Sequence, residues 1–180
     1  LCQLDKTYLY YLGNYNKALV QRNNLLKQIG TRKELSDTVS VWDMQLAEYG
    51  GGIIKARKKL VEELNELLPE INSKLSGGRD KLSVKYEPNV SETDFGTKLA
   101  MNFERDLFLK ATGNGPHRDD ISFYVGDKNL KLYGSQGQQR TAALALKLAE
   151  IELVRNKTLP DIHLNLSKDL NIRRIVIKLG

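Results

Sequence analysis

Apolar residues recur every three or four positions along the first part of the chain, which is the spacing of a helix with one buried face. A first series is interrupted only at Arg22, and Gly30 follows it at a position where glycine commonly ends a helix. Its apolar members are Tyr8, Leu12, Tyr15, Leu19, Leu26 and Ile29. The pattern therefore predicts an amphipathic helix that ends at Gly30.

A second and longer apolar series predicts another helix, with Ser36 or Asp37 as its N-terminal cap. Its members are Leu35, Val39, Trp42, Leu46, Tyr49, Ile53, Ala56, Leu60, Leu64, Leu67 and Ile71. Both apolar faces need a cover, and the simplest arrangement packs them against each other in an antiparallel helical hairpin. We interpret residues 1–78 as a structural arm of this kind.

Three consecutive glycines at 50–52 interrupt the second series without changing its phase. Each glycine costs about 1 kcal/mol in a helix interior. We therefore expect a continuous but weakened helix that could act as a hinge. Pro69 should kink this helix near its end, and Gly77 and Gly78 should stop it.

The pattern changes after residue 78. Alternating Leu82, Val84 and Tyr86 predict a strand over 81–86, which Pro88 ends. The other expected elements are a helix over 91–107 capped by Ser91 or Thr93, strands over 121–125 and 130–133 around a Gly126-Asp127 turn, and a helix that opens at Ser135 and runs to Val154. The last helix carries Leu144, Leu146, Leu148, Ile151 and Leu153, so we expect burial on more than one side. The fold class is therefore α+β, with a mixed unit over 79–180 after the long antiparallel helical arm.

Composition is that of an ordinary soluble domain, with 41% hydrophobic and 28% charged residues. The net charge of +6 permits nucleic-acid binding without proving it. Arg57, Lys58 and Lys59 form a basic run that is either a solvated face or a weak contact to DNA phosphate. A single cysteine, Cys2, suits a reducing cytosol, and no stretch is long and apolar enough to cross a membrane. The chain does not begin with Met and looks like a piece of a longer, cytoplasmic protein.

The turn Gly134–Thr141 is the stretch with the clearest chemistry. Ser135 is a good N-cap, and Gly134 and Gly137 let a ligand approach the backbone closely. A hydroxyl and several free N–H groups at a helix N-terminus favour an anion. An ordinary capped helix is the simpler interpretation of a Ser-x-Gly turn alone.

A second polar stretch, Gly115–Asp120, precedes a predicted strand. It is either a turn held by Pro116 and Asp side chains or a place where His117 and Arg118 lie near a phosphate or a partner subunit. We identify no metal-ligand cluster and no catalytic arrangement of nucleophile and base. The sequence also lacks a Gly-x-x-x-x-Gly-Lys-Ser/Thr loop, so it cannot itself hold a nucleotide in the usual manner.

Two long strings resemble the RecF family of bacterial recombination mediators, which is related in fold to ABC-type and SMC-type ATPases. They are Gly-Pro-His-Arg-Asp-Asp-Ile at 115–121 and Tyr-Gly-Ser-Gln-Gly-Gln-Gln-Arg-Thr-Ala-Ala-Leu-Ala-Leu-Lys-Leu-Ala-Glu-Ile-Glu-Leu at 133–153. The resemblance covers roughly residues 1–158 and implies a helical arm followed by part of an α/β P-loop ATPase head. The resemblance also implies that this sequence lacks the N-terminal part of the head, where the P-loop should lie.

The resemblance assigns an ABC-type signature motif to Ser135, Gln136, Gly137, Gln138, Gln139 and Arg140. In such proteins the signature of one head closes on ATP held by the P-loop of a partner head. The resemblance thus implies an ATP-dependent homodimer that clamps double-stranded DNA near single-strand gaps and, with RecR-like partners, aids RecA loading. ATP and Mg²⁺ are the expected cofactors of the full-length protein, and none is expected for this chain alone.

The tail 159–180 departs from the family pattern, because the acidic pair that should follow an apolar strand is absent. Those carboxylates hold Mg²⁺ and the attacking water in the family. We therefore do not expect ATP hydrolysis by this chain alone. Two alternatives remain open: an SMC-type head-and-arm ATPase, and a non-enzymatic helical interaction module whose Ser-Gln-Gly turn is merely a cap.

Overall fold

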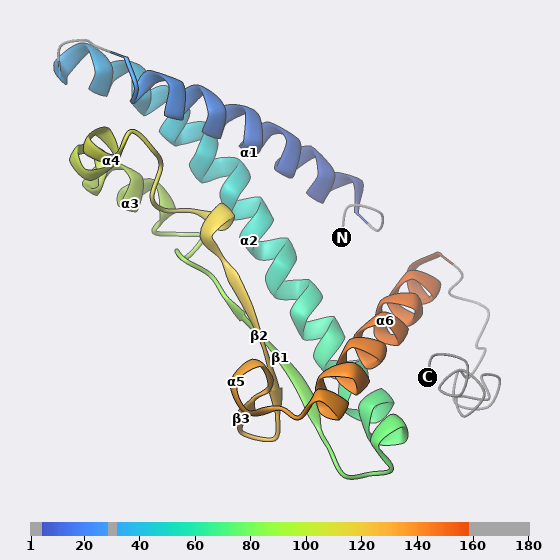
Figure 1. Ribbon diagram of the computed structural model, residues 1–180. Helices are drawn as coiled ribbons and strands as arrows, with labels where there is room; N and C mark the ends of the chain where they lie inside the picture. Colours follow the sequence, from blue (N-terminus) through green and yellow to red (C-terminus); the bar gives the residue numbers. More distant parts are fainter. Residues whose placement is uncertain (1–4, 29–31, 159–180) are drawn as a thin grey trace. The chain divides into compact units, whose positions relative to one another are not determined.

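The computed structural model describes residues 5–28 and 32–158 (Figure 1). Helix α1 spans Lys6–Leu25 and opens at Asp5, whose carboxylate accepts the backbone N–H groups of Thr7 and Tyr8. The helix ends earlier than predicted, because Leu26 and not Gly30 is its C-cap. Gly30 and the tail 159–180 lie outside the described residues.

Helix α2 is continuous over Arg32–Ser76, as the unbroken phase of the apolar series predicts. Because the helix begins at Arg32, Ser36 and Asp37 lie inside it, and the prediction that either caps it was wrong. Gly77 and Gly78 have φ angles of 68° and 82°, and the Gly78 N–H donates to the Ser73 carbonyl at 2.7 Å. This is a Schellman cap, so the two glycines end the helix as expected. The kink at Pro69 stays a prediction.

The glycines inside α2 make room for aromatic rings. A Cβ atom on Gly50 would lie 2.5 Å from Cε1 of Phe95, and one on Gly52 would lie 2.5 Å from Cδ2 of Tyr11. Gly51 has only ordinary neighbours, the nearest being the Glu92 carbonyl oxygen at 3.8 Å. Close packing therefore explains two of the three glycines, and it argues against the hinge that we considered.

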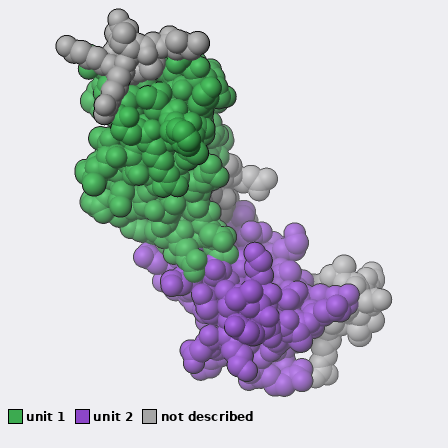
Figure 2. All heavy atoms as spheres, turned by 60° about the vertical axis from the view of Figure 1, so that its left-hand side comes forward, with its two compact units in different colours: residues 1–60, 86–121 green, residues 61–85, 122–180 purple. Residues whose placement is uncertain are grey.

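The chain divides into two compact units (Figure 2). Unit 1 contains residues 1–60 and 86–121, and unit 2 contains residues 61–85 and 122–180. These units do not coincide with the predicted arm over 1–78 and head over 79–180, because the second part of α2 belongs to a unit with the sheet and the last helix. The division into arm and head is an expectation from the family and stays a prediction.

Unit 1 is built on α1 and the first part of α2, which run antiparallel side by side (Figure 1). Arg22, near the end of α1, pairs with Asp43, while Tyr8, near its start, accepts a hydrogen bond from Arg57. The core of the unit contains Tyr8, Tyr15, Ala18, Leu46, Ile53, Ile54, Val90, Phe95 and Leu99. The predicted hairpin is thus present in this unit.

Two short helices replace the single helix predicted over 91–107. Helix α3 spans Phe95–Met101 and α4 spans Phe103–Leu109. Asn102 separates them, and its side-chain amide donates to the Lys98 carbonyl at 2.8 Å. A side chain that bonds the backbone locally competes with the helix ladder, which is a physical reason for the break. Neither predicted cap holds, because the N-cap position of α3 is Asp94.

Unit 2 carries most of a three-stranded sheet with the order β1-β2-β3. Strand β1 spans Leu82–Glu87, β2 spans Asp120–Val125 and β3 spans Lys128–Asn129. Strands β2 and β3 form a hairpin around the predicted Gly126-Asp127 turn, with Val125 opposite Lys128 and Gly126 at a φ of 57°. The second part of α2 supports β1, because the Asn65 amide group both donates to and accepts from the backbone of Val84 at 2.8 Å.

The strand predicted over 130–133 is wrong, since Leu130–Tyr133 forms a short helix, α5. The Asn129 side chain accepts the N–H groups of Lys131 and Leu132 and so starts a helical turn. Helix α6 follows over Gln136–Thr158. Its buried residues, Ala142, Ala145, Leu148, Ala149 and Leu153, lie toward one face, and Ile151 is 55% exposed. The expectation of burial on more than one side therefore fails at Ile151. In the part of the chain that the structure describes, no helix could span a membrane.

Candidate functional site

The predicted signature turn is a capping box at the start of α6. The Ser135 hydroxyl oxygen accepts the Gln138 N–H at 3.2 Å, and the Gln138 side-chain oxygen accepts the Ser135 N–H at 3.0 Å. Two N–H groups that a helix end would leave unpaired are thus satisfied reciprocally. This explains why a Ser-x-x-Gln spacing begins the helix at this point.

A cavity of about 460 Å³ opens beside this turn. It is lined by Leu75, Ser76, Arg79, Asp80, Ser135, Gly137, Gln138 and Thr141, all of which belong to unit 2. Ser135 and Gly137 are exposed. Room for a foreign group therefore exists next to the hydroxyl and the first N–H groups of the helix.

The other residues of the motif differ in their surroundings. Gln136, Gln139 and Arg140 are exposed, and the Gln139 amide donates to the Gly134 carbonyl at 3.2 Å. Gly134 is needed for packing, because a Cβ atom there would lie 2.5 Å from the Leu130 carbonyl oxygen. Of the two glycines that we expected to face a ligand, only Gly137 is open toward the cavity.

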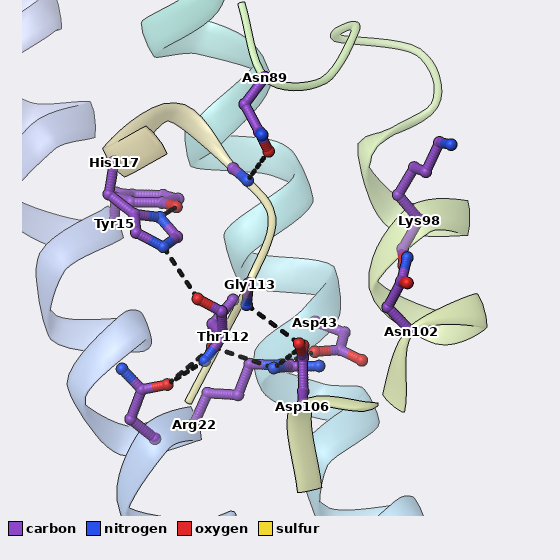
Figure 3. A network of polar contacts seen from close by, with 12 residues as sticks. Tyr15, Arg22, Asp43, Asn89, Lys98, Asn102, Asp106, Thr112, Gly113 and His117 are labelled. Carbon is purple, nitrogen blue, oxygen red and sulfur yellow. Dashed lines mark hydrogen bonds and ion pairs between the residues drawn. The ribbon is translucent and has the colours of Figure 1, made fainter. Parts of the chain in front are cut away.

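His117 has two partners within unit 1 (Figure 3). Its Nε2 atom lies 3.1 Å from the Thr112 carbonyl oxygen and must donate, since a carbonyl only accepts. Nδ1 therefore accepts the hydrogen of the Tyr15 hydroxyl, 2.6 Å away. His117 as a whole is exposed, but desolvation of its ring where it packs against Tyr15 lowers its pKa, and burial raises the pKa of Tyr15. Both groups are thus held neutral, which favours the structural interpretation of His117.

Gly115 packs closely against the Tyr15 hydroxyl and the Phe95 ring. It has a φ of 133°, and a Cβ atom there would lie 2.5 Å from the Tyr15 hydroxyl. The 3₁₀ turn over Pro116–Arg118 follows it, and Arg118 is exposed. The role of His117 and Arg118 near a phosphate or a partner subunit stays a prediction.

Asp119 is the acceptor at the centre of a second cluster in unit 1. Its carboxylate accepts Nη1 of Arg57 at 2.7 Å, the Asn89 N–H at 2.9 Å and the Tyr86 hydroxyl. Arg57 also donates to the Pro116 carbonyl at 2.6 Å. The turn interpretation expected an Asp side chain to hold this stretch, and Asp119 does so by pairing with Arg57 of α2.

The basic run at 57–59 is therefore not one uniform face. Arg57 is turned toward Asp119 and its side chain is 22% exposed, whereas Lys59 is exposed. Lys58 lies 3.8 Å from the Glu92 carboxylate in an exposed pair, which contributes little to stability. The geometry supports a structural role for Arg57 and leaves the two lysines as candidates for contact with phosphate.

The interruption of the first apolar series at Arg22 is a buried ion-pair network (Figure 3). Arg22 is fully buried and donates to Asp43 at 2.5 Å, to Asp106 at 2.7 Å and to the Thr112 hydroxyl at 3.0 Å. Asp106 is fully buried as well and also accepts the Gly113 N–H at 3.0 Å. Sequence reasoning missed this cluster, although a lone arginine within an apolar series is the signal that could have revealed it.

Within residues 5–28 and 32–158, no group of three or more His, Cys, Asp or Glu side chains could hold a metal ion. The carboxylates of the unit 1 clusters, Asp106 and Asp119, instead accept hydrogen bonds from arginine, tyrosine and backbone N–H groups, whereas the buried Nη2 atom of Arg22 has no hydrogen-bond partner among the described residues. Of the two cavities described, the larger, about 610 Å³, is lined by Asp37, Asp43 and Glu104, whereas the one at Ser135 lies at a helix N-terminus. The turn at Ser135 and its cavity are therefore the better candidate for an anionic ligand.

The chain was compared with protein families, curated proteins and solved structures. No protein-family model matches the chain. The DNA replication and repair protein RecF of Lachnoclostridium phytofermentans is 55% identical over 158 residues, which are 88% of this chain and 44% of that protein. RecF of Agathobacter rectalis is 56% identical over 155 residues, which are 86% of this chain and 43% of that protein.

A solved structure of a recombination mediator protein, RecF-ATP in the RecFOR pathway, superposes with a TM-score of 0.80. It is 32% identical in sequence, and the match covers 98% of this chain and 51% of that one. The chain thus spans about half the length, or less, of the RecF proteins that it matches. With matches at this identity over most of its length, and with an α+β structure that superposes on part of a RecF chain, the chain belongs to the RecF family.

Proposed function

We propose that the chain contributes the signature half of an ATP-binding interface in a RecF-type protein of DNA replication and repair. The observation that carries the proposal is the open turn at the start of α6, where Ser135 and Gly137 are exposed and line a cavity of about 460 Å³. Arg79 lines the same cavity. A hydroxyl, a helix N-terminus and a guanidinium are groups that bind phosphate oxygens.

The cap geometry leaves the right donors available. The Ser135 oxygen accepts from Gln138, so its own hydrogen can be donated to a ligand. The N–H groups of Gln136 and Gly137 occupy the first positions of α6, where a helix offers no acceptor of its own. Three donors can thus converge on one anion without breaking the cap.

On this proposal the whole protein acts as an ATP-dependent homodimer, in which the P-loop of each head faces the signature of the other. Bound ATP with Mg²⁺ would supply the negative charge that joins the two heads, and neither is expected to bind this chain alone. The dimer would clamp double-stranded DNA near single-strand gaps and, with RecR-like partners, aid RecA loading. The arm over 1–78 and the partial head over 79–180 are part of the same proposal.

Contact with the DNA backbone is assigned to the exposed lysines and not to Arg57. Lys59 and the half-exposed Lys58 lie on α2, and the chain carries a net charge of +6. Binding that rests on phosphate contacts weakens steeply as salt is added, by a factor that rises with the number of contacts. A duplex-binding titration at several salt concentrations measures that slope.

The test uses a full-length RecF protein that contains this sequence, studied by sedimentation with and without ATP. Ser135→Asp keeps a good N-cap and so preserves the fold, but it places a carboxylate against the triphosphate. We expect ATP-dependent dimerisation to be lost. The matched control is Asn129→Asp, which makes the same kind of change at the cap of α5 and should leave dimerisation intact.

Retained ATP-dependent dimerisation in Ser135→Asp would overturn the proposal. A protein that never dimerises with ATP would support the alternative of a non-enzymatic interaction module. An SMC-type head shares the signature chemistry, and the relatives named above argue for RecF instead.

A further inference from the structure

We propose that Asp80 is a positioning residue for the signature turn: its carboxylate holds the Gln138 side chain, and Gln138 in turn holds Ser135. The Gln138 Nε2 atom donates to Oδ1 of Asp80 at 3.2 Å. The same Gln138 amide group accepts the Ser135 N–H through Oε1 at 3.0 Å. Neither the apolar pattern nor the family motif points to Asp80.

The two bonds fix which way the Gln138 amide faces. An amide group has one accepting oxygen and one donating nitrogen. Because a carboxylate only accepts, Asp80 selects the orientation in which the nitrogen faces it and the oxygen faces the Ser135 N–H. Without Asp80 the amide could rotate, and the capping box would lose one of its two bonds.

Asp80 itself is anchored to the end of α2. Its N–H donates to the Ser76 hydroxyl at 3.2 Å, and its carbonyl oxygen accepts Nδ2 of Asn72 at 3.0 Å. Ser76 and Asn72 are 6% and 2% exposed and lie one helical turn apart. The backbone of Asp80 is thus held on both sides by buried side chains of α2.

The position of this carboxylate is otherwise unfavourable for an ATP site. Asp80 lines the cavity beside Ser135 and carries the charge that repels phosphate. A residue whose only effect was its charge would therefore weaken nucleotide binding. The Asp80 carboxylate instead acts through its hydrogen bond to Gln138. That bond orders the N-terminus of α6, which the ligand would contact.

The inference rests on the proposed function for its consequence in ATP binding, but the hydrogen bonds can be tested without nucleotide. The first experiment measures amide exchange of the Ser135 N–H and the side-chain amide resonance of Gln138 by NMR in the full-length protein. We expect Asp80→Ala to speed Ser135 exchange by roughly five- to tenfold, the loss of about one hydrogen bond. Asp80→Asn retains an acceptor and should stay within about twofold of the original rate.

A swap of donor and acceptor separates positioning from a merely structural role. Gln138→Glu keeps the oxygen that accepts the Ser135 N–H but sets two carboxylates against each other, so Ser135 exchange should rise. Adding Asp80→Asn to Gln138→Glu restores a donor opposite an acceptor and should rescue the slow exchange. The control, Asp127→Ala, removes an exposed carboxylate of the same unit and should change neither readout.

The second experiment measures ATP-dependent dimerisation of the Asp80 variants. Positioning predicts that Asp80→Ala weakens dimerisation roughly five- to tenfold while Asp80→Asn does not. A pure charge effect predicts that both variants strengthen it equally. The inference is overturned if Asp80→Ala and Asp80→Asn change the Ser135 exchange rate equally. It is also overturned if Asp80→Asn fails to restore slow exchange in Gln138→Glu. Failure of the proposed function would appear separately, as ATP-dependent dimerisation that survives Ser135→Asp.

Discussion

The Tyr15 hydroxyl lies 2.6 Å from Nδ1 of His117 and donates its hydrogen to that nitrogen. The bond requires a neutral imidazole, because a protonated ring offers only donors. Desolvation of its ring lowers the pKa of His117 below its ordinary value of 6.5. The fold therefore holds this histidine in the state that acid removes.

We predict that the free energy of unfolding falls as the pH falls below about 6.5. The unfolded state binds a proton near pH 6.5, whereas the folded state resists it until lower pH, so stability is complete above about pH 6.5 and is lost below it. Urea unfolding at several pH values measures the slope. The slope should be smaller in His117→Gln than in the original chain. An equal slope in His117→Gln and the original chain would contradict the prediction.

Substitution of adjacent glycines in α2 should have opposite effects. Gly50→Ala places a Cβ atom 2.5 Å from the Phe95 ring, and overpacking of this kind costs about 1–3 kcal/mol. Gly51→Ala meets no such obstacle and should gain up to about 1 kcal/mol from helix propensity. Thermal unfolding of the two variants checks both signs, and a stabilised Gly50→Ala would show that the ring can move aside.

Removal of one partner of the buried Arg22–Asp106 pair should be destabilising. Asp106→Ala removes one of the two carboxylates that the fully buried guanidinium contacts and leaves Asp43 as its remaining ion-pair partner. We expect a loss of about 1.5–3 kcal/mol, the value of a hydrogen bond to a charged group. Chemical denaturation should show this loss, while Asp127→Ala, an exposed change of the same type, should lie within about 0.5 kcal/mol of the original chain. A loss under 1 kcal/mol for Asp106→Ala would mean that water replaces the carboxylate.

Arg57 and Lys59 should separate stability from binding. Arg57→Ala removes three hydrogen bonds, to Asp119, the Pro116 carbonyl and the Tyr8 hydroxyl, and it should cost about 2–3 kcal/mol of unfolding free energy. Lys59→Ala should leave stability unchanged and reduce only the salt-dependent part of duplex DNA binding. Denaturation and a binding titration on the same two variants test this division. The opposite pattern would return Arg57 to the DNA-contacting surface.

Periodicity predicted the long helices well, because burial of one face dominates their stability. It predicted that α2 continues through Gly50–Gly52. The structure explains two of these glycines, because aromatic rings pack closely against Gly50 and Gly52. The predictions that were wrong fail where a side chain bonds the backbone locally. Asn129 starts a helical turn where a strand was expected, and Asn102 divides one predicted helix into two. Such local hydrogen bonds leave little trace in an apolar pattern.

The candidate site was predictable where its residues are contiguous. Ser135 and Gln138 lie within one turn, so their spacing alone indicates a cap. Asp80 and Asp119 could not be found in this way, because their partners lie 58 and 62 positions away in the sequence. Arg22 was visible only as an exception to a pattern, and its meaning depended on Asp106, 84 positions further on.

The carboxylate of Asp119 has a consequence for how the protein is made. Synthesis delivers Arg57, Tyr86 and Asn89 before the residue that joins them, since Asp119 follows them by 62, 33 and 30 positions. A nascent chain can therefore assemble its first two helices early, but the guanidinium on the second must stay in contact with water until the ribosome has passed residue 119. A chain that ends before that residue would lack the Arg57–Asp119 ion pair and the bonds from Asp119 to Tyr86 and Asn89.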